Sequence, residues 1–469
     1  MSVRSLLSFA FALSCLVSFA FANYPVQFEN SKVIRVLDVN NAIVREDTGI
    51  RAKNIDDKPA TEYYIYNPTN VETHTASISA YMKKTKTELE VIKLEYIREA
   101  ELHIYKVVLN EPVQPGDDIL LGIKSVYTHL INPVPATLPQ IARQHTLYGF
   151  NSYFFSPYHT KEQKTTLYKN VIHHSGAQDK TSAKDNGKIV YGPYIDTQPF
   201  SFEYATCHFE NSHPFITVTS LRRDIEVSHW GNILAVEEHY AIRNDGAGLD
   251  SNFNRGQYML TGHIHEHTNV LKELEFDLPV SAHDTYYRDE VGNVSTSHFR
   301  VEKKKAILEL KPRYPLFGGW NYTWHHGYNA ALGSYLHKSD SGKYILNVDF
   351  VESVKDKSID KAIVRVIFPE GAKNVKVNTP FDIDSQAITS YSTYFDSTGR
   401  IMVVLEKNNL VKEHELPIQI EYDYSVVNLL QKPFVASIGF FVLFSISIVL
   451  NRMSFVINSQ KEKANLKKE

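Results

Sequence analysis

The chain has 469 residues, a formal net charge of −3 and 43% hydrophobic residues, which is the composition of a folded protein and not of a disordered one. A net charge this close to zero gives no electrostatic reason to expect nucleic-acid binding. The length is sufficient for two domains that each bury a sizeable core.

The first segment is apolar. Met1–Ala22 carries a single charge, Arg4, and ends in Ala20-Phe21-Ala22, the small-x-small pattern that precedes signal-peptidase cleavage. We therefore predict a signal peptide over residues 1–22 and a mature chain that begins near Asn23. The alternative is an uncleaved N-terminal anchor.

Cleavage would leave one cysteine. Cys15 is removed with the signal peptide, so Cys207 is the only cysteine of the predicted mature chain. An intramolecular disulfide is then excluded, which is unusual for a secretory chain. We expect Cys207 to be buried as a small apolar residue, with a bridge to a partner as the alternative.

The region between the two ends has the alternation of apolar and polar residues that is typical of half-buried strands. Three segments show it best: residues 344–350, with Tyr344, Leu346, Val348 and Phe350 on one face; residues 362–368, with Ala362, Val364, Val366 and Phe368; and residues 418–424. The 28 tyrosines and 25 phenylalanines suit packed sheet surfaces. Turn signals punctuate the runs: Pro115-Gly116-Asp117, Asn186-Gly187, Asn244-Asp245-Gly246 and Pro369-Glu370-Gly371. The pattern predicts a mainly β fold of the antiparallel sandwich class.

Internal similarity predicts two such units. A shift of 192 residues (232 minus 40) lays Asn40, Val44, Glu46, Ile50 and Arg51 on Asn232, Val236, Glu238, Ile242 and Arg243. A shift of 297 residues (416 minus 119) lays Ile119–Ile123 and Tyr127 beside Leu416–Ile420 and Tyr424. We predict two tandem β-sandwich-like domains over residues 23–219 and 220–425, followed by a linker over 426–432.

The segment His263-Ile264-His265-Glu266-His267 is the strongest candidate for a metal site. On a strand the three imidazoles would share one face, at a spacing that zinc can use. We favour the other interpretation, a solvated edge strand, and predict no metal site. The pairs His173-His174 and His325-His326 alternate between faces, so neither is a ligand pair.

The sequence lacks the recognisable motifs of enzymes. It has no G-x-S-x-G elbow, no H-E-x-x-H, no phosphate-binding glycine loop and no dinucleotide fingerprint. Its carboxylates form no acid/base pair that can be identified from sequence. We therefore predict neither catalytic residues nor a cofactor.

Two N-glycosylation sequons are present, at Asn293 and Asn321, whereas Asn67-Pro68-Thr69 is excluded by its proline. We expect both asparagines to lie on exposed loops and to be modified. The second sequon overlaps Arg313–Tyr322, where Gly318-Gly319 stands between bulky aromatic residues. Paired glycines predict a structural corner there, with a partner-contact loop as the alternative.

The apolar run Pro433–Ile457 is long enough to cross a membrane as a helix, with Arg452 able to snorkel to the far headgroups. Lysines predominate in the tail, residues 458–469, which predicts a cytosolic tail and a type I single-pass topology. The small residues Ala436, Ser437 and Gly439 could allow close packing against partner helices.

Four segments carry a resemblance to a known family: Leu221–Trp230, Tyr286–His298, Arg313–Tyr322 and Phe368–Asn374. They resemble the ribophorin I family, the first subunit of the oligosaccharyltransferase complex. The resemblance runs from about Val33 through the membrane span.

This resemblance implies residence in the endoplasmic reticulum membrane, with the bulk of the chain in the lumen. It implies a non-catalytic accessory or scaffold role in the transfer of oligosaccharide from dolichyl diphosphate to Asn of N-x-S/T in nascent proteins. The partners it implies are the other subunits, including the multi-spanning catalytic one, nascent polypeptides and the translocon. No catalytic residues exist in the family to carry over.

One departure from the family and two rival functions complete the predictions. Longer members have a large cytosolic helical domain that this sequence lacks, so we do not expect direct ribosome docking. The rivals are a lumenal zinc-dependent hydrolase that uses His263, His265 and His267, and a cell-surface adhesion or receptor sandwich.

Overall fold

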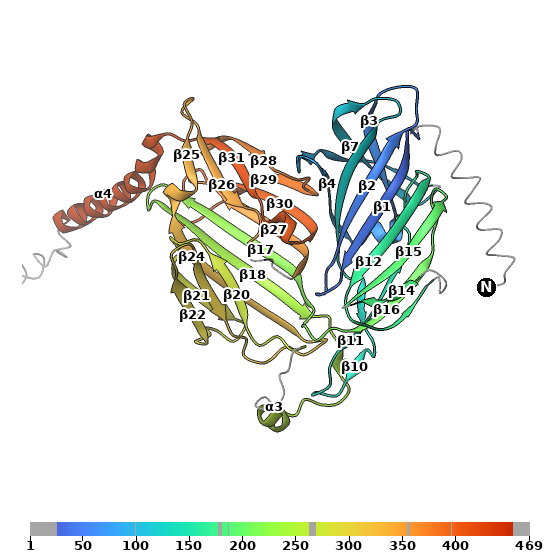
Figure 1. Ribbon diagram of the computed structural model, residues 1–469. Helices are drawn as coiled ribbons and strands as arrows, with labels where there is room; N and C mark the ends of the chain where they lie inside the picture. Colours follow the sequence, from blue (N-terminus) through green and yellow to red (C-terminus); the bar gives the residue numbers. More distant parts are fainter. Residues whose placement is uncertain are drawn as a thin grey trace, which may run out of the picture.

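The computed structural model describes residues 26–98, 100–176, 181–185, 187–261, 269–352, 354, 357–394 and 396–453. Two β-sandwiches follow each other along the chain, and one long helix follows the second (Figure 1). The predicted mainly β class is confirmed. The predicted signal peptide over residues 1–22 and the predicted tail over 458–469 lie outside the described residues.

The first sandwich has a large sheet as one layer. Its eight strands in spatial order are β14 (Thr181–Asp185), β15 (Lys188–Thr197), β12 (Thr160–Tyr168), β1 (Phe28–Asp38), β2 (Val44–Asn54), β8 (Asp118–Tyr127), β4 (Thr75–Met82) and β5 (Glu88–Leu89). β1 and β12 are parallel, and the other neighbours are antiparallel. Alternate side chains of β1 are buried, as the period of two in a strand requires.

Two smaller sheets pack against this large sheet. One consists of β3 (Ala60–Pro68), β7 (Leu102–Val113) and β6 (Val91–Ile97), and the other of β13 (Val171–Ser175), β16 (Tyr204–Glu210), β11 (His145–Asn151) and β9 (Ile131–Pro133). A short helix, α2 (Thr69–Glu72), follows β3. Each smaller sheet shares a separate hydrophobic cluster with the large sheet, so the core of this sandwich has two parts.

The second sandwich repeats the arrangement. Its large sheet runs in the order β21 (His283–Asp289), β24 (Asn321–Ala331), β18 (Ile233–Asn244), β17 (Ile216–Ser228), β27 (Ser358–Ile367), β30 (Arg400–Leu410) and β29 (Ser385–Tyr391). The smaller sheets are β20 (Leu274–Leu278), β23 (Ala306–Leu310) and β22 (Ser297–Val301), and β25 (Leu336–Lys338), β26 (Tyr344–Asp349), β31 (Pro417–Asp423) and β28 (Lys373–Asn378). A single hydrophobic cluster joins all three sheets. The three segments predicted as alternating strands are β26, β27 and β31, which confirms those predictions.

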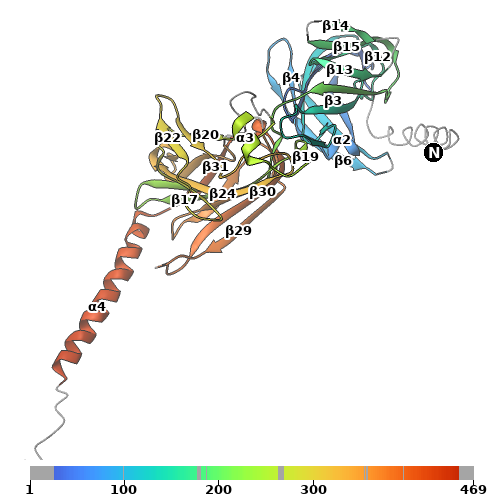
Figure 2. The same ribbon diagram turned by 90° about the horizontal axis from the view of Figure 1, so that it is seen from below.

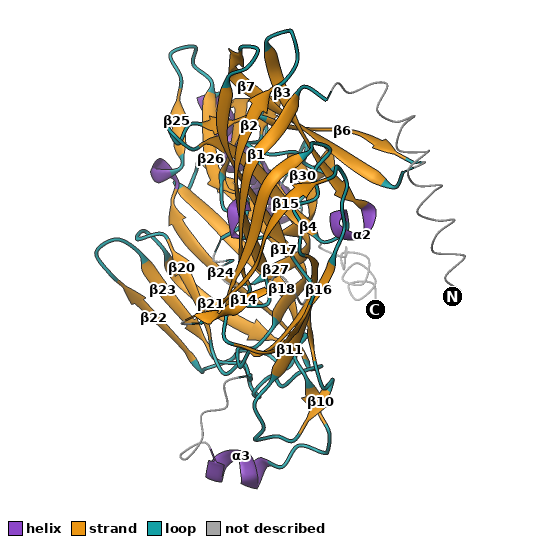
Figure 3. Ribbon diagram, turned by 45° about the vertical axis from the view of Figure 1, so that its right-hand side comes forward, coloured by secondary structure: helices purple, strands orange, loops and turns teal. Residues whose placement is uncertain are grey.

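The two sandwiches share one strand order. β1, β2 and β12 occupy the places of β17, β18 and β27, including the central parallel pair (Figure 1). Strands make up most of both units, as Figure 3 shows by colour. The shift of 192 residues lays β2 on β18, which are equivalent strands. The shift of 297 residues was wrong as an alignment, because β8 lies in a large sheet and β31 in a small one. The predicted boundary at residues 219 and 220 falls inside β17, and the division into domains stays a prediction.

The sandwiches also contact each other directly. β10 (Thr137–Leu138) pairs in parallel with β19 (Gly248–Leu249). The backbone amide of Ala247 donates to Oε1 of Gln144 at 2.7 Å. Helix α3 (Arg255–Thr261) follows β19 at this end of the molecule (Figure 1). Strand pairing therefore joins the two units in addition to the chain itself.

The C-terminal helix, α4 (Gln431–Arg452), is preceded by one 3-10 turn, η5 (Val426–Leu430), and extends away from both sandwiches (Figure 2). By length and composition it could cross a membrane, and none of its apolar window is buried against the protein. The helix covers most of the predicted span 433–457, begins two residues earlier and ends at Arg452. Residues 454–457 lie outside the described part of the chain.

Candidate functional site

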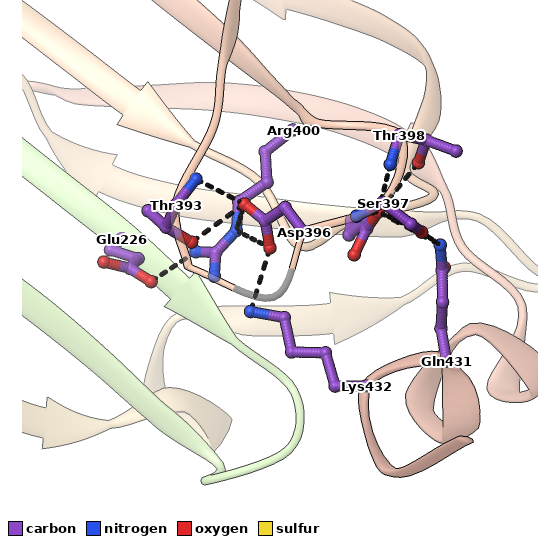
Figure 4. A network of polar contacts seen from close by, with 9 residues as sticks. Glu226, Thr393, Asp396, Ser397, Thr398, Arg400, Gln431 and Lys432 are labelled. Atoms are coloured by element: carbon purple, nitrogen blue, oxygen red, sulfur yellow. Dashed lines mark hydrogen bonds and ion pairs between the residues drawn. The ribbon is translucent and has the colours of Figure 1, made fainter. Parts of the chain in front are cut away.

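The first turn of α4 is tied to the second sandwich by a set of polar side chains that we call the junction network (Figure 4). Its members are Glu226, Glu370, Thr393, Asp396, Ser397, Thr398, Arg400, Gln431 and Lys432. They come from the end of β17, from the turn before β28, from the β29–β30 hairpin and from α4. The junction network therefore joins elements that are far apart in the sequence.

Asp396 binds the lysine of the helix. Its side chain is fully buried, and Oδ1 lies 3.0 Å from Nζ of Lys432. Oδ2 lies 3.1 Å from Nε of Arg400 and accepts hydrogen bonds of 2.8 Å from the backbone amide and the hydroxyl of Thr393. Burial opposes the ionisation of Asp396, but these donors outweigh it and lower its pKa to about 2. Asp396 is therefore a fixed negative charge beneath the start of α4.

Glu370 makes the second connection. Its Oε1 accepts from the backbone amides of Ser397 and Thr398 at 2.7 and 2.6 Å, and from Nε2 of Gln431 at 3.0 Å. Burial opposes its ionisation as well, but hydrogen bonds from Thr398 and Ser397 lower its pKa. Glu370 belongs to the predicted turn Pro369-Glu370-Gly371, and Gly371 has φ +90°, where glycine is favoured.

These contacts show what the junction network can do chemically. Both oxygens of Asp396 and Oε1 of Glu370 are occupied by protein donors, whereas Oε2 of Glu370 is buried and has no partner among the described residues. Arg400 also donates to Glu226. Asp396 is a poor base or nucleophile, since its negative charge is already stabilised by donors on both oxygens. The arrangement is suited to holding the helix in a fixed position.

Exposed apolar side chains surround the start of α4. Trp230, on the turn between β17 and β18, is 71% exposed, and Tyr394, on the β29–β30 hairpin, is 92% exposed. Val427 of η5 is 73% exposed. Trp230 and Lys432 are among the residues that line a pocket of about 200 Å³ at the start of α4.

Each sandwich also buries an arginine against a glutamate. In the first, Nη2 of Arg35 lies 2.7 Å from Oε2 of Glu46. In the second, Arg223 contacts both Glu238 and Glu352, and burial together with the second carboxylate raises the pKa of Glu352. Sequence reasoning missed both pairs, although the shift of 192 residues had aligned Glu46 with Glu238.

Both predicted glycosylation sites lie at one corner of the second sandwich. Asn293 and Asn321 are exposed, Asn293 in the turn after β21 and Asn321 at the first position of β24. Oδ1 of Asn293 accepts from Nε of Arg288 at 2.8 Å. The hydroxyl of Thr323, the third residue of the second sequon, donates to Glu290 at 2.7 Å. The loop position expected for Asn321 is corrected to a strand terminus.

The other singled-out residues are structural or lie outside the described residues. His263, His265 and His267 lie outside them. Cys207 is buried as predicted, and burial raises the pKa of its thiol to about 11. Gly318 packs so closely on the backbone of Ala247 that a Cβ would meet its carbonyl oxygen at 2.1 Å, which is the predicted corner.

One cluster has the geometry of a metal site. Ligand atoms of Asp224, Glu237 and His239 all lie within 4.8 Å of one another. Asp224 is held by Arg365, however, and Glu237 accepts from Tyr286. Protein donors therefore already use this cluster.

Comparisons with known proteins agree on one family. A family model described as Ribophorin I matches residues 28–451. Dolichyl-diphosphooligosaccharide--protein glycosyltransferase subunit 1 of Caenorhabditis elegans is 34% identical over 436 residues, which are 92% of this chain and 74% of that protein. Subunit 1B of Oryza sativa subsp. japonica is 32% identical over 447 residues, 92% of this chain and 93% of that protein.

Likeness to solved structures is weak. Native yeast LTA4 hydrolase is 7% identical with a TM-score of 0.28, over 42% of this chain and 31% of that one. An M1 zinc metallopeptidase from Deinococcus radiodurans is 10% identical with a TM-score of 0.25, over 44% and 48% of the two chains. At such TM-scores the likeness carries no argument about function.

Proposed function

The chain belongs to the ribophorin I family, and on that premise we propose that it is a non-catalytic accessory subunit of the dolichyl-diphosphooligosaccharide–protein glycosyltransferase complex. It supports transfer of oligosaccharide to Asn of N-x-S/T in nascent proteins. The observation that carries this proposal is the family match over residues 28–451.

The proposed role is positional. α4 crosses the membrane of the endoplasmic reticulum, and the sandwiches lie on its lumenal side. Asp396 and Glu370 support this proposal, because they fix the first turn of α4 to the second sandwich. The chemical step is proposed to belong to the multi-spanning subunit, and nascent polypeptides and the translocon are the other proposed partners.

The exposed aromatic residues near the start of α4 support a position of this end of the second sandwich at the membrane surface. Trp and Tyr prefer the headgroup layer, since their rings are apolar at one end and polar at the other. Trp230 and Tyr394 flank the point where α4 leaves the sandwich. In bilayers that contain brominated lipid, we expect quenching of Trp230 fluorescence and loss of that quenching in Trp230→Phe. Equal quenching in both proteins would contradict this position at the membrane surface.

Glycosylation follows from the same topology. Asn293 and Asn321 are exposed, and on the lumenal side both would be accessible to the modifying enzyme. We propose that both carry glycans of the high-mannose form. Asn293→Gln and Asn321→Gln should each increase gel mobility by one glycan, and the double variant should match the enzymatically deglycosylated protein.

The decisive experiment is purification in mild detergent through a tag on residues 458–469. We expect the other subunits of the complex to co-purify, and depletion of the protein to leave sequons of substrate proteins underglycosylated. Asp396→Asn combined with Glu370→Gln should reduce this recovery, whereas Glu302→Gln, which changes an exposed carboxylate in the turn after β22, should not. Recovery of the wild-type chain alone, with normal glycosylation after depletion, would overturn the proposal.

A further inference from the structure

The first sandwich contains a cavity of about 520 Å³. It lies where the large sheet meets the two smaller ones, with Glu46 of β2 on one wall and Tyr66 of β3 and Tyr148 of β11 on the others. Sites for small molecules and peptide side chains usually have volumes of this order. We call it the first-sandwich cavity.

The fold does not require this space. In the second sandwich, a void that Glu352, the partner of the buried arginine, helps to line is only about 10 Å³. Tyr240 and Trp324 stack there with ring centroids 4.9 Å apart, and Glu352 reaches in from the segment after β26. Because the same strand order packs solidly in one unit, the hollow in the other is a local feature of its side chains.

The walls define the chemistry of an occupant. Of the 24 lining residues, five are phenylalanines and five are tyrosines. The charged ones are Arg35 and Glu46, which neutralise each other at 2.7 Å. A charged occupant would lose its hydration without gaining an opposite charge, so the cavity favours an uncharged, apolar or aromatic group.

One wall group is the buried Arg35. It is 9% exposed and donates through Nη1 to the carbonyl of Asn151 and through Nη2 to Glu46. Its Nε is buried and has no hydrogen-bond partner among the described residues, and the same is true of Nε of Arg223 in the second sandwich. The unpartnered Nε is therefore a feature of both buried ion pairs, and the cavity wall offers an occupant no free charge.

The wall also contains strand backbone that lacks a neighbour on one side. β9 pairs only with Thr146, Leu147 and Tyr148 of β11. Gly149–Asn151 continue β11 past the end of β9, where none of the described strands covers that side, although Arg35 already donates to the carbonyl of Asn151. An extended chain can add to such an edge and place alternate side chains to one side of it. Phe202 and Tyr204, 62% and 60% exposed, also line the cavity.

We propose that the first-sandwich cavity binds an extended, uncharged polypeptide segment that carries aromatic or aliphatic side chains. The segment adds beside Gly149, and its side chains enter the cavity between the aromatic walls. This inference rests on the proposed function in one respect: nascent polypeptides are the partners that would supply such a segment. The evidence for binding comes from the cavity and its lining.

The test uses the full-length protein in detergent and a fluorescein-labelled ten-residue peptide with alternating Phe or Leu and Thr. Asn70→Trp places a large side chain at the mouth of the cavity, since Asn70 is an exposed lining residue of α2. Thr73→Trp is the matched control, because Thr73 is exposed beside the same helix but does not line the cavity. By fluorescence anisotropy we expect Asn70→Trp to weaken binding at least tenfold, and Thr73→Trp to change it less than twofold.

Three outcomes would overturn the proposal. These are unchanged affinity in Asn70→Trp, equal binding of a peptide in which Ser replaces every Phe and Leu, and displacement of the peptide by a maltooligosaccharide. Thermal unfolding of both variants excludes a folding defect as the cause of lost binding. Crosslinking of the peptide to benzoylphenylalanine at position 202 places it in the cavity, and its absence would count against the proposal. Subunit recovery in mild detergent reports on the proposed function separately, since Asn70 is remote from α4.

Discussion

The two sandwiches place a buried arginine in the same central strand, yet they surround it differently. Arg223 faces two carboxylates, and the void that Glu352 lines measures only about 10 Å³, whereas Arg35 faces one carboxylate and two backbone carbonyls beside a cavity of about 520 Å³. The comparison separates two features. The arginine–glutamate pair belongs to the shared fold, while the large space next to Arg35 is set by the side chains of the first sandwich.

The largest expected difference comes from removal of the arginines. Arg223→Met leaves Glu238 and Glu352 buried without a counterion, which should destabilise the second sandwich by about 3–5 kcal/mol. Arg35→Met should destabilise the first sandwich by only about 2 kcal/mol, because water in the cavity can solvate Glu46. Hydrogen exchange in β18 and in β2 measures each unit separately. Equal losses in the two variants would show that water in the cavity does not solvate Glu46.

The next largest expected effect is a pH dependence of the stability of the second sandwich. His414 of η4 (Lys412–His414) is buried; its Nδ1 accepts from the amide of Val411, and burial lowers its pKa to about 4. The imidazole takes up a proton near pH 6.5 in the unfolded chain but only near pH 4 in the folded chain. The free energy of unfolding is therefore highest above pH 6.5 and decreases as the pH falls from 6.5 to 4. The loss should be about 3 kcal/mol.

His414→Asn keeps an acceptor for Val411 and should remove this pH dependence. The matched variant His337→Asn changes an exposed histidine and should preserve it. Hydrogen exchange of β30 and β31 between pH 7 and pH 4.5 is the measurement. A slope that persists in His414→Asn would assign the response to another group.

The smallest expected effect compares added volume in the two cores. Val354→Phe inserts a ring beside the void of about 10 Å³ and should cost about 1–3 kcal/mol, since overpacking strains its neighbours. Val71→Phe directs a ring into the first-sandwich cavity and should change stability by less than about 0.5 kcal/mol. Thermal unfolding of both variants tests this contrast, and a large loss in Val71→Phe would mean that the cavity is already filled by its own side chains.

Sequence reasoning succeeded where the signal is local. Alternation predicted β26, β27 and β31, and the paired glycines predicted the corner at Gly318. The alignment of Glu46 with Glu238 even marked the equivalent buried pairs, although a lone acidic residue in a strand usually faces solvent. Alternation alone also misled, because β8 and β31 have similar patterns in sheets of different kinds.

The site depends on contacts that no local pattern encodes. The turn signal at Pro369–Gly371 predicts chain reversal, but nothing near it indicates that Glu370 meets Gln431, 61 residues later. The cavity depends on the spacing of three sheets, which is set by side chains on many strands. Tertiary packing, which no single sequence displays, decided both features.

The paired strands β10 and β19 have a mechanical consequence. Their pairing joins the two sandwiches in addition to the connecting chain, so a force on the first sandwich is passed to the second through both routes. Asp396 and Lys432 link the second sandwich to the first turn of α4. The same force would therefore be passed on to the start of α4.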